Sequence, residues 1–452
     1  MLTRLKGAKV VDPGNIDAEK DILIKNGYIE AILDSGEPYP RVEKSTSGSD
    51  SSLVSVSSAD SSFSLDVENN QYIEIDVSGK IVVPGLIDLH VHLREPGHEY
   101  KETIETGLMA AARGGFTAVC PMANTSPVND NAQVTSFIIN RAKELGLSRI
   151  YPVGAITKGL KGESLAEFGD MKKAGIAAVS DDGCPVENSM LMRRALEYAK
   201  GLNIPVISHS EDLSLSKNGA MNEGITATKL GIKGIPNAAE ASFIMREICL
   251  AELAGAPIHI AHVSCEESVE AIRNAKKRGI KVTCETAPHY FTLTEKAVAE
   301  YDTNAKMNPP LRTEKDRQAI IKGLADGTID CIATDHAPHS SLEKDLEFDM
   351  AAFGIIGLET SLPLSLKLVE NGILSFETLI EKMSKNPASI LGINNDLKPD
   401  NPADITVIDM ESCFTIDPKS FLSKSRNTPF AGFKVTGEAY ITMVKGKIIY
   451  QR

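Results

Sequence analysis

The sequence has no run of 18 apolar residues, no Cys-x-x-Cys pair, and too few basic residues to balance its acidic ones. Without an apolar run of that length we expect no membrane span, and the polar start of the chain predicts no signal peptide. With 48 basic against 61 acidic residues the net charge is −13, which argues against nucleic acid or an anionic membrane as the main partner. An anionic substrate would have to be held by local cations or by metal.

The seven cysteines have no paired spacing, which is typical of reduced thiols rather than of a disulfide framework. We therefore expect a cytoplasmic protein. The apolar fraction of 42% and the charged fraction of 24% are those of a globular chain. A length of 452 residues predicts either a large catalytic domain with a smaller companion or one elaborated barrel.

One stretch differs from the rest in composition. Residues 45–64 hold eleven serines and few large apolar residues, so we interpret 45–68 as a mobile or surface insertion. Short strand-like pieces punctuated by turn residues lie on both sides of it, and similar pieces occur near the far end of the chain. We predict that residues 1–80 and 396–452 together form one small β-sandwich domain.

The central part, residues 81–395, alternates between strand-like and helix-like segments. Apolar strand-like runs occur at 81–92, 117–122, 150–156, 176–181, 204–209, 257–262, 281–286 and 330–335. Amphipathic stretches such as "NSMLMRRALEYAKGL" and "EESVEAIRNAKKRG" separate most of them, and several end in glycine. Eight strands with helical crossovers predict an α/β fold of the (β/α)8 TIM-barrel type. A doubly wound open sheet is the alternative, but no G-x-G-x-x-G follows a strand, which argues against its dinucleotide-binding version.

Polar residues close many of these apolar runs. Because side chains alternate along a strand, His90 and His92 in "IDLHVHLREPG" face the same way. Chemistry in such barrels lies at the carboxyl ends of the strands. The residues found there are His90 and His92 on the first strand, Asp181 and Asp182 on the fourth, His209 on the fifth, His262 on the sixth and Asp335 on the eighth. Each one alone is most simply a buried polar group with an ordinary partner or a helix cap. Together they predict a hydrolytic zinc site with one or two metals.

Alternation also separates near neighbours. His259 lies three residues before His262, and His336 directly follows Asp335, so we expect both to point away from the site. His339 follows the last strand in a loop. His98 and His289 we interpret as structural or supporting residues. Alternation does not distinguish Asp181 from Asp182, because the end of that strand is not fixed to one residue.

Many short motifs occur in an order that resembles one known family. They are "GLIDLHVHLREPGHEYKETIETG", "PMANTSP", "SDDG", "SHSED", "HIAHVS", "NPPLR", "IATDHAPH", "FGIIGLE", "NPASILG" and "PADITVID". The chain resembles the dihydroorotases of class I, the bacterial monofunctional type, in the amidohydrolase superfamily. The resemblance spans the predicted barrel and both flanks and leaves out only the serine-rich insertion. No lysine stands in "GIAAVSDDG", so the resemblance is to the branch whose metals are bridged by an aspartate.

The resemblance implies a role for particular residues. His90, His92 and Asp335 would hold a first zinc, His209 and His262 a second, and Asp182 would bridge them. Asp335 would also be the catalytic proton shuttle. The residues implied in substrate binding are Arg94, Asn124 and His339 on the carboxylate, Asn308, Phe353 and Gly354 on the amide edge of the ring, and His92.

The implied activity is the zinc-dependent, reversible cyclisation of N-carbamoyl-L-aspartate to L-dihydroorotate in pyrimidine biosynthesis. A homodimer and an association with aspartate carbamoyltransferase are expected with it. Two alternatives stay open: a related cyclic amidase of the hydantoinase or dihydropyrimidinase kind, and a non-catalytic scaffold for aspartate carbamoyltransferase. The predicted carboxylate contacts argue against the first, and the complete set of metal ligands argues against the second.

Overall fold

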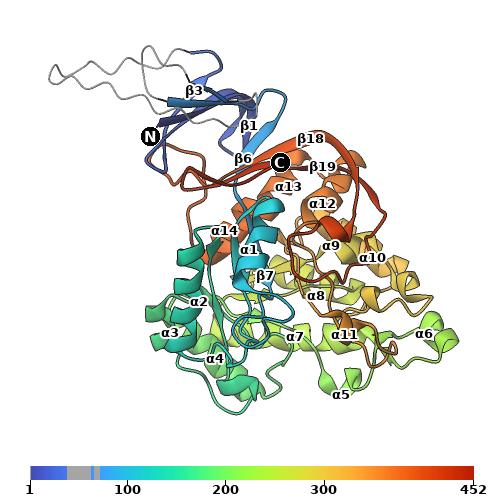
Figure 1. Ribbon diagram of the computed structural model, residues 1–452. Helices are drawn as coiled ribbons and strands as arrows, with labels where there is room; N and C mark the ends of the chain where they lie inside the picture. The colour runs from blue at the N-terminus through green and yellow to red at the C-terminus, as the bar shows by residue number, and fades with distance from the viewer. Residues whose placement is uncertain (1, 38–62, 66–71) are drawn as a thin grey trace.

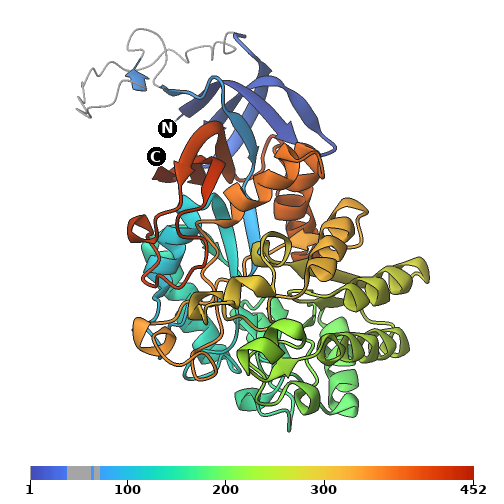
Figure 2. The ribbon, with the colours of Figure 1, turned by 90° about the vertical axis from the view of Figure 1, so that its right-hand side faces the viewer.

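The computed structural model describes residues 2–37, 63–65 and 72–452. The strands from the two ends of the chain lie at the top in both views, and most helices lie below them (Figure 1 and Figure 2). Most of the predicted serine-rich insertion, residues 45–62 and 66–68, lies outside the described residues. Within the described part, no helix combines the length and the apolar character needed to cross a membrane.

One nine-stranded sheet, here called the terminal sheet, contains strands from both ends of the chain. Its strands are β1(Leu2–Asp12), β2(Ile16–Lys25), β3(Tyr28–Asp34), β4(Phe63–Leu65), β5(Tyr72–Asp76), β6(Ile81–Pro84), β18(Ile405–Thr415), β19(Lys434–Val444) and β20(Lys447–Gln451). The main order is β20-β19-β18-β6-β1-β2-β3, and β5 pairs with β1 and β4. The joint lies at β6, which runs antiparallel to β18 and parallel to β1. The predicted β-sandwich would need a second sheet packed on this one, and that part stays a prediction.

The part of the molecule below the terminal sheet contains short parallel strands. They are β7(Leu86–Val91), β8(Phe116–Pro121), β9(Arg149–Ile150), β10(Val153–Gly154), β11(Ala178–Val179), β12(Ile207–Ser208), β15(Ile258–Ile260), β16(Val282–Thr286) and β17(Cys331–Ile332). Parallel pairs join β7-β8-β9, β10-β11 and β12-β15-β16-β17. Isolated parallel bridges join Val179 to Val206 and Val91 to His336, so the last strand segment contacts the first. Every residue of β7 and β8 is buried, as expected for parallel strands covered on both faces.

Helices separate these strands and pack against them. They are α1(Ile104–Arg113), α2(Ala132–Leu145), α3(Phe168–Ala174), α4(Ser189–Gly201), α5(Leu213–Ser216), α6(Ile225–Leu230), α7(Asn237–Ala254), α8(Glu266–Lys277), α9(Pro288–Thr292), α10(Glu314–Ala325), α11(Ser341–Lys344), α12(Ser361–Glu370), α13(Phe376–Ile380) and α14(Asn386–Leu391). A pair of two-residue strands, β13(Met221–Asn222) and β14(Gly234–Ile235), flanks α6. The predicted helices are confirmed at α4, α7 and α8. Gly255 ends α7 in the left-handed conformation and Gly279 follows α8 with a φ of 79°, whereas the cap of α4 is Leu202.

Two predicted strands are each divided in two. The run 81–92 forms β6 in the terminal sheet and β7 in the lower part, with Gly85 between them. A Cβ at Gly85 would lie 2.0 Å from Oγ1 of Thr117, so glycine leaves the space that the Thr117 side chain occupies. The run 150–156 is divided around Pro152, which has no N–H to donate to a neighbouring strand. Periodicity alone did not predict either break.

Candidate metal centre

The two histidines at the end of β7 meet the aspartate that follows β17. Nε2 of His92 lies 3.1 Å from Oδ1 of Asp335, and Nε2 of His90 lies 3.5 Å from the same oxygen. Ligand atoms of these three side chains all lie within 4.8 Å of one another. The alternation of side chains along β7 explains why both imidazoles reach one point although Val91 stands between them.

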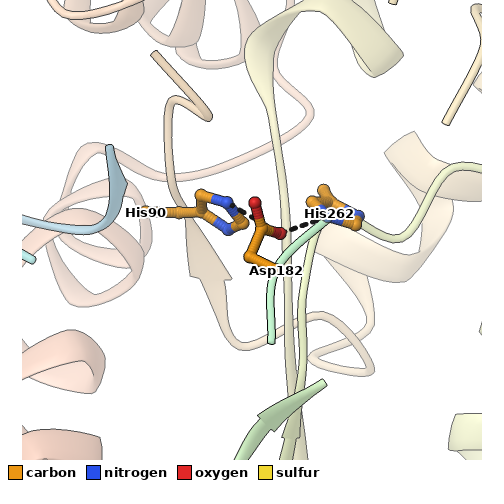
Figure 3. Close-up of side chains that lie close together, drawn as sticks. All are labelled: His90, Asp182 and His262. Atoms are coloured by element: carbon orange, nitrogen blue, oxygen red, sulfur yellow. Dashed lines mark hydrogen bonds and ion pairs between the residues drawn. The ribbon is translucent and has the colours of Figure 1, made fainter. Parts of the chain in front are cut away.

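Asp182 lies at the middle of a second group, which shares His90 with the first. Oδ1 of Asp182 is 3.3 Å from Nε2 of His90 and 3.4 Å from Nε2 of His262. Figure 3 shows the carboxylate between these two rings. Nδ1 of His209 lies 3.4 Å from the same oxygen and 2.9 Å from Nε2 of His262. The structure therefore gathers all the predicted metal ligands around one carboxylate.

The donor set fits a metal. The predicted ligands are each at most 6% exposed. Nε2 of His90 is buried without a hydrogen-bond partner, although it faces two carboxylates. Imidazole nitrogens and carboxylate oxygens converging on one buried point are the ligands that zinc and similar divalent ions prefer. Among the described residues of this group of predicted ligands, Nε2 of His90 and Nδ1 of His262 are the buried atoms without a hydrogen-bond partner.

Three residues that follow the carboxyl ends of these strands have backbone angles that favour glycine. The φ angles are 34° at His262, 46° at Asp335 and 63° at Arg94. Such angles are uncommon for residues with a side chain, and they cluster at functional sites. The strands thus end in turns that aim polar side chains at the centre.

A buried glutamate on β16 orients His90. Oε1 of Glu285 lies 2.9 Å from Nδ1 of His90, and Oε2 lies 3.2 Å from Nε2 of His259. Burial opposes the charge of Glu285, but its hydrogen bonds with His259 and His90 outweigh burial and lower its pKa to about 2. A carboxylate that accepts from Nδ1 leaves Nε2 of His90 as the free lone pair toward the centre. Our sequence reasoning missed Glu285, although an acid inside a buried strand was an available signal.

Glu211 supports the second group in the same way. Its Oε2 lies 3.1 Å from Nε2 of His209 and accepts from Nδ2 of Asn308 at 3.0 Å. This leaves Nδ1 of His209 toward Asp182. Asn308, predicted to contact substrate, is therefore linked to a predicted metal ligand through Glu211. Sequence reasoning missed Glu211 as well, because its partner choice depends on tertiary structure.

Three neighbours of the predicted ligands, Asp181, His336 and His259, lie away from the centre, and alternation had predicted this for the two histidines. Oδ1 of Asp181 accepts from the backbone N–H groups of Ile156 at 2.7 Å and Thr157 at 3.0 Å, so Asp181 braces a loop while Asp182 faces the centre. Nε2 of His336 lies 3.3 Å from Glu102, away from the predicted ligands. His259 contacts Glu285 rather than the centre.

Arg94 and His339, predicted to bind a carboxylate, lie side by side. Arg94 donates from Nε to the carbonyl oxygen of Pro338 at 3.1 Å and from Nη2 to Nε2 of His339 at 3.3 Å. A guanidinium only donates, so Nε2 of His339 is the acceptor and its proton sits on Nδ1. Burial, together with the charge of Arg94, lowers the pKa of His339 to about 3. Nδ1 of His339 makes no hydrogen bond within the described residues, and it lies 3.7 Å from Oε2 of Glu343.

Asn124 and Gly354, both predicted to contact substrate, also make contacts within the protein. Oδ1 of Asn124 lies 2.9 Å from Nδ1 of His92, so this side chain orients a predicted metal ligand. The N–H of Gly354 donates to the carbonyl oxygen of Lys306 at 2.9 Å, and its own carbonyl accepts two hydrogen bonds from protein side chains. Both backbone polar groups of Gly354 are thus already used. The neighbouring Phe353 lies with its ring 4.4 Å from Nζ of Lys306.

Comparisons with known proteins agree with one another. Residues 79–268 match the family model described as "Dihydro-orotase-like". The chain is 67% identical over 454 aligned residues to a protein named dihydroorotase from Desulforapulum autotrophicum, with all of both chains covered. It is 55% identical to another of that name from Geobacter metallireducens, with 99% of each covered. Among solved structures, an L-hydantoinase (dihydropyrimidinase) from Arthrobacter aurescens matches with a TM-score of 0.82 and 26% identity, covering 99% of this chain and 96% of that one.

Proposed function

The chain belongs to the dihydroorotase family and is an amidohydrolase, and from this premise we propose that it catalyses the reversible ring closure of N-carbamoyl-L-aspartate to L-dihydroorotate. The observation that carries the proposal is the buried cage of imidazoles and acids around Asp182. We also propose that the enzyme acts in pyrimidine biosynthesis and that it belongs to the class I, bacterial monofunctional type. The aspartate in place of a bridging lysine supports that type.

We propose that the cage holds zinc, with two ions favoured over one. The first would be held by His90, His92 and Asp335, the second by His209 and His262, and Asp182 lies where it would touch both. Zinc bound there would polarise the substrate carbonyl and lower the pKa of a bound water toward ~7. Glu285, Glu211 and Asn124 present the unprotonated nitrogens of their histidines to the site.

Asp335 is the proposed proton carrier. Its Oδ1 lies 3.1 Å from Nε2 of His92 at the centre of the cage, where its carboxylate would act as a base. In the hydrolytic direction it takes a proton from the attacking water as the new C–O bond forms. It then delivers that proton to the ring nitrogen as the C–N bond breaks. In ring closure the same proton moves the opposite way, and water leaves.

Arg94 and His339 are the proposed anchor for the substrate carboxylate. A guanidinium offers a fixed fork of donors that matches a carboxylate, and the imidazole of His339 lies beside it, with its Nε2 3.3 Å from Nη2 of Arg94. Because the protein carries a net charge of −13, this local donor pair has to overcome an unfavourable overall field. Asn308, Phe353 and Gly354 stay predicted contacts to the ring. Asn124 stays a predicted contact to the carboxylate, and His92 a predicted contact to the substrate.

The remaining parts of the proposal concern the setting of the site. We infer that the parallel strands β7 to β17 form a (β/α)8 barrel, supported by their parallel pairs and by the bridge from Val91 to His336. Seven free cysteines support a cytoplasmic enzyme. A homodimer and an association with aspartate carbamoyltransferase stay predictions.

A second candidate is a hydantoinase or dihydropyrimidinase, favoured by the structural match to the Arthrobacter enzyme. The test is a comparison of L-dihydroorotate, dihydrouracil and hydantoin as substrates, with metal content measured on the same preparation. We expect zinc and turnover of L-dihydroorotate alone. Preferred hydrolysis of dihydrouracil or hydantoin would favour the second candidate. A folded protein with neither metal nor turnover would favour the scaffold.

A further inference from the structure

The segment after His339 turns a lysine inward and apolar side chains outward. In residues 340–354, Lys344 at the end of α11 is 3% exposed, whereas Leu342 is 83% and Met350 69% exposed. Lysine is almost never fully buried unless it has partners that satisfy its charge. This reversal of the usual pattern indicates that Lys344 has a specific task inside the segment.

The partners of Lys344 are all backbone carbonyls. Its Nζ donates to the carbonyl oxygens of Ala352 at 2.8 Å, Gly354 at 3.1 Å and Lys306 at 3.4 Å. An ammonium group has three N–H donors, and here each faces one acceptor. Lys344 lies in the first half of the segment, and Ala352 and Gly354 lie at its end. Lys306 belongs to the neighbouring loop before Asn308. One side chain therefore ties both ends of the segment to a second loop.

The same carbonyl of Gly354 is held from another direction. Nδ2 of Asn427 donates to the carbonyl oxygens of Gly354 at 3.0 Å and Ala337 at 2.9 Å, while its Oδ1 accepts from the N–H of His339 at 3.1 Å. A Cβ on Gly354 would lie 2.8 Å from Cδ2 of His339, so the two residues are in close contact. The position of the His339 ring thus depends on where Gly354 is held.

We propose that Lys344 is a positioning residue for the substrate site, holding residues 340–354 folded so that Gly354 supports His339 beside Arg94. This inference rests on the proposed role of Arg94 and His339 as the carboxylate anchor. The hydrogen bonds of Lys344 within the described residues go to backbone carbonyls and to none of the predicted metal ligands. Its loss would leave buried carbonyls without donors and would let the segment open. Substrate binding would suffer, and metal binding would not.

The test uses Lys344→Met, which keeps the aliphatic length and removes the donors. The matched control is Lys382→Met, because Lys382 is also 3% exposed and donates from Nζ to a backbone carbonyl, that of Ile329 at 2.7 Å. For each full-length, metal-loaded protein we would measure kcat and KM for L-dihydroorotate, bound metal, and amide hydrogen exchange within residues 340–354. We expect Lys344→Met to raise KM roughly tenfold or more, with a smaller change in kcat. Metal content should be unchanged, and exchange should accelerate in that segment.

Lys382→Met should lower thermal stability without changing KM or exchange in residues 340–354. An unchanged KM in Lys344→Met, or an equal rise in both variants, would overturn the proposal. If the unaltered protein does not turn over L-dihydroorotate, the proposed function fails. The amide hydrogen exchange of residues 340–354 then tests the role of Lys344 separately. Faster exchange confined to residues 340–354 in Lys344→Met would support it, and unchanged exchange would refute it.

Discussion

Replacing Glu285 with glutamine should weaken metal binding although Glu285 itself is no ligand. Glu285 accepts from Nδ1 of His90 at 2.9 Å and from Nε2 of His259 at 3.2 Å, and it is 1% exposed, so no solvent can take over either contact. Glutamine has the same shape but only one acceptor oxygen. Its NH₂ group must then face one of the two imidazoles, and that ring has to move its proton to the other nitrogen or lose its hydrogen bond.

If His90 is the ring that changes, the proton moves to Nε2, the atom that faces Asp182 and Asp335. Loss of such a supporting partner typically lowers metal affinity ~10- to 100-fold, which corresponds to ~1.4–2.7 kcal/mol. The assay is a zinc titration in competition with a chromophoric chelator, with circular dichroism to verify the fold.

Glu102→Gln is the matched control for this experiment. Glu102 is 0% exposed and lies 3.3 Å from Nε2 of His336, a histidine that faces away from the centre. The Glu102→Gln variant should retain the zinc affinity of the unaltered protein. Equal zinc affinity in Glu285→Gln and the unaltered protein, or an equal loss in both variants, would refute the reasoning that Glu285 acts through His90.

Three further changes probe other parts of the molecule. Asp335→Asn should lower kcat for L-dihydroorotate at least ~10³-fold, since it removes a predicted ligand and the proton carrier together; substantial residual turnover would contradict the double role. Arg94→Ala should raise KM ~10- to 100-fold with little change in bound zinc, and an unchanged KM would exclude Arg94 as the carboxylate anchor. Glu247 is 1% exposed, and burial, opposed by Arg246, raises its pKa from 4.5 to about 7. The folded state therefore binds the proton more tightly, and stability is lost as pH rises from 4.5 through 7. Glu247→Gln should raise the free energy of unfolding by about 3 kcal/mol at about pH 8 and far less at about pH 5, as measured by urea denaturation; equal gains at both would refute this.

Alternation and strand ends carried the sequence analysis furthest. They predicted that His90 and His92 share a face and that His259 and His336 point elsewhere, and the structure places these rings in that way. These inferences need only the two-residue period of a strand, which is fixed by backbone geometry.

The contacts around the ligands could not be predicted in the same way. The pairing of Asn124 with His92, and of Glu285 with His90, depends on which side chains tertiary folding brings within 3 Å. The side chain of Lys344 is buried, whereas lysine usually prefers solvent, so the residue type alone would predict an exposed side chain. The breaks at Gly85 and Pro152 depend on strands that diverge into different sheets.

The joint at β6 also has a consequence for how the protein is made. A ribosome releases β6 and the adjoining β7, with the first two histidines of the cage, long before it releases β18, the partner to which β6 pairs. Until then β6, which leads directly into β7, has an open edge, and contacts this distant in the chain form slowly. Stalling translation before β18 should therefore leave nascent chains open to proteases.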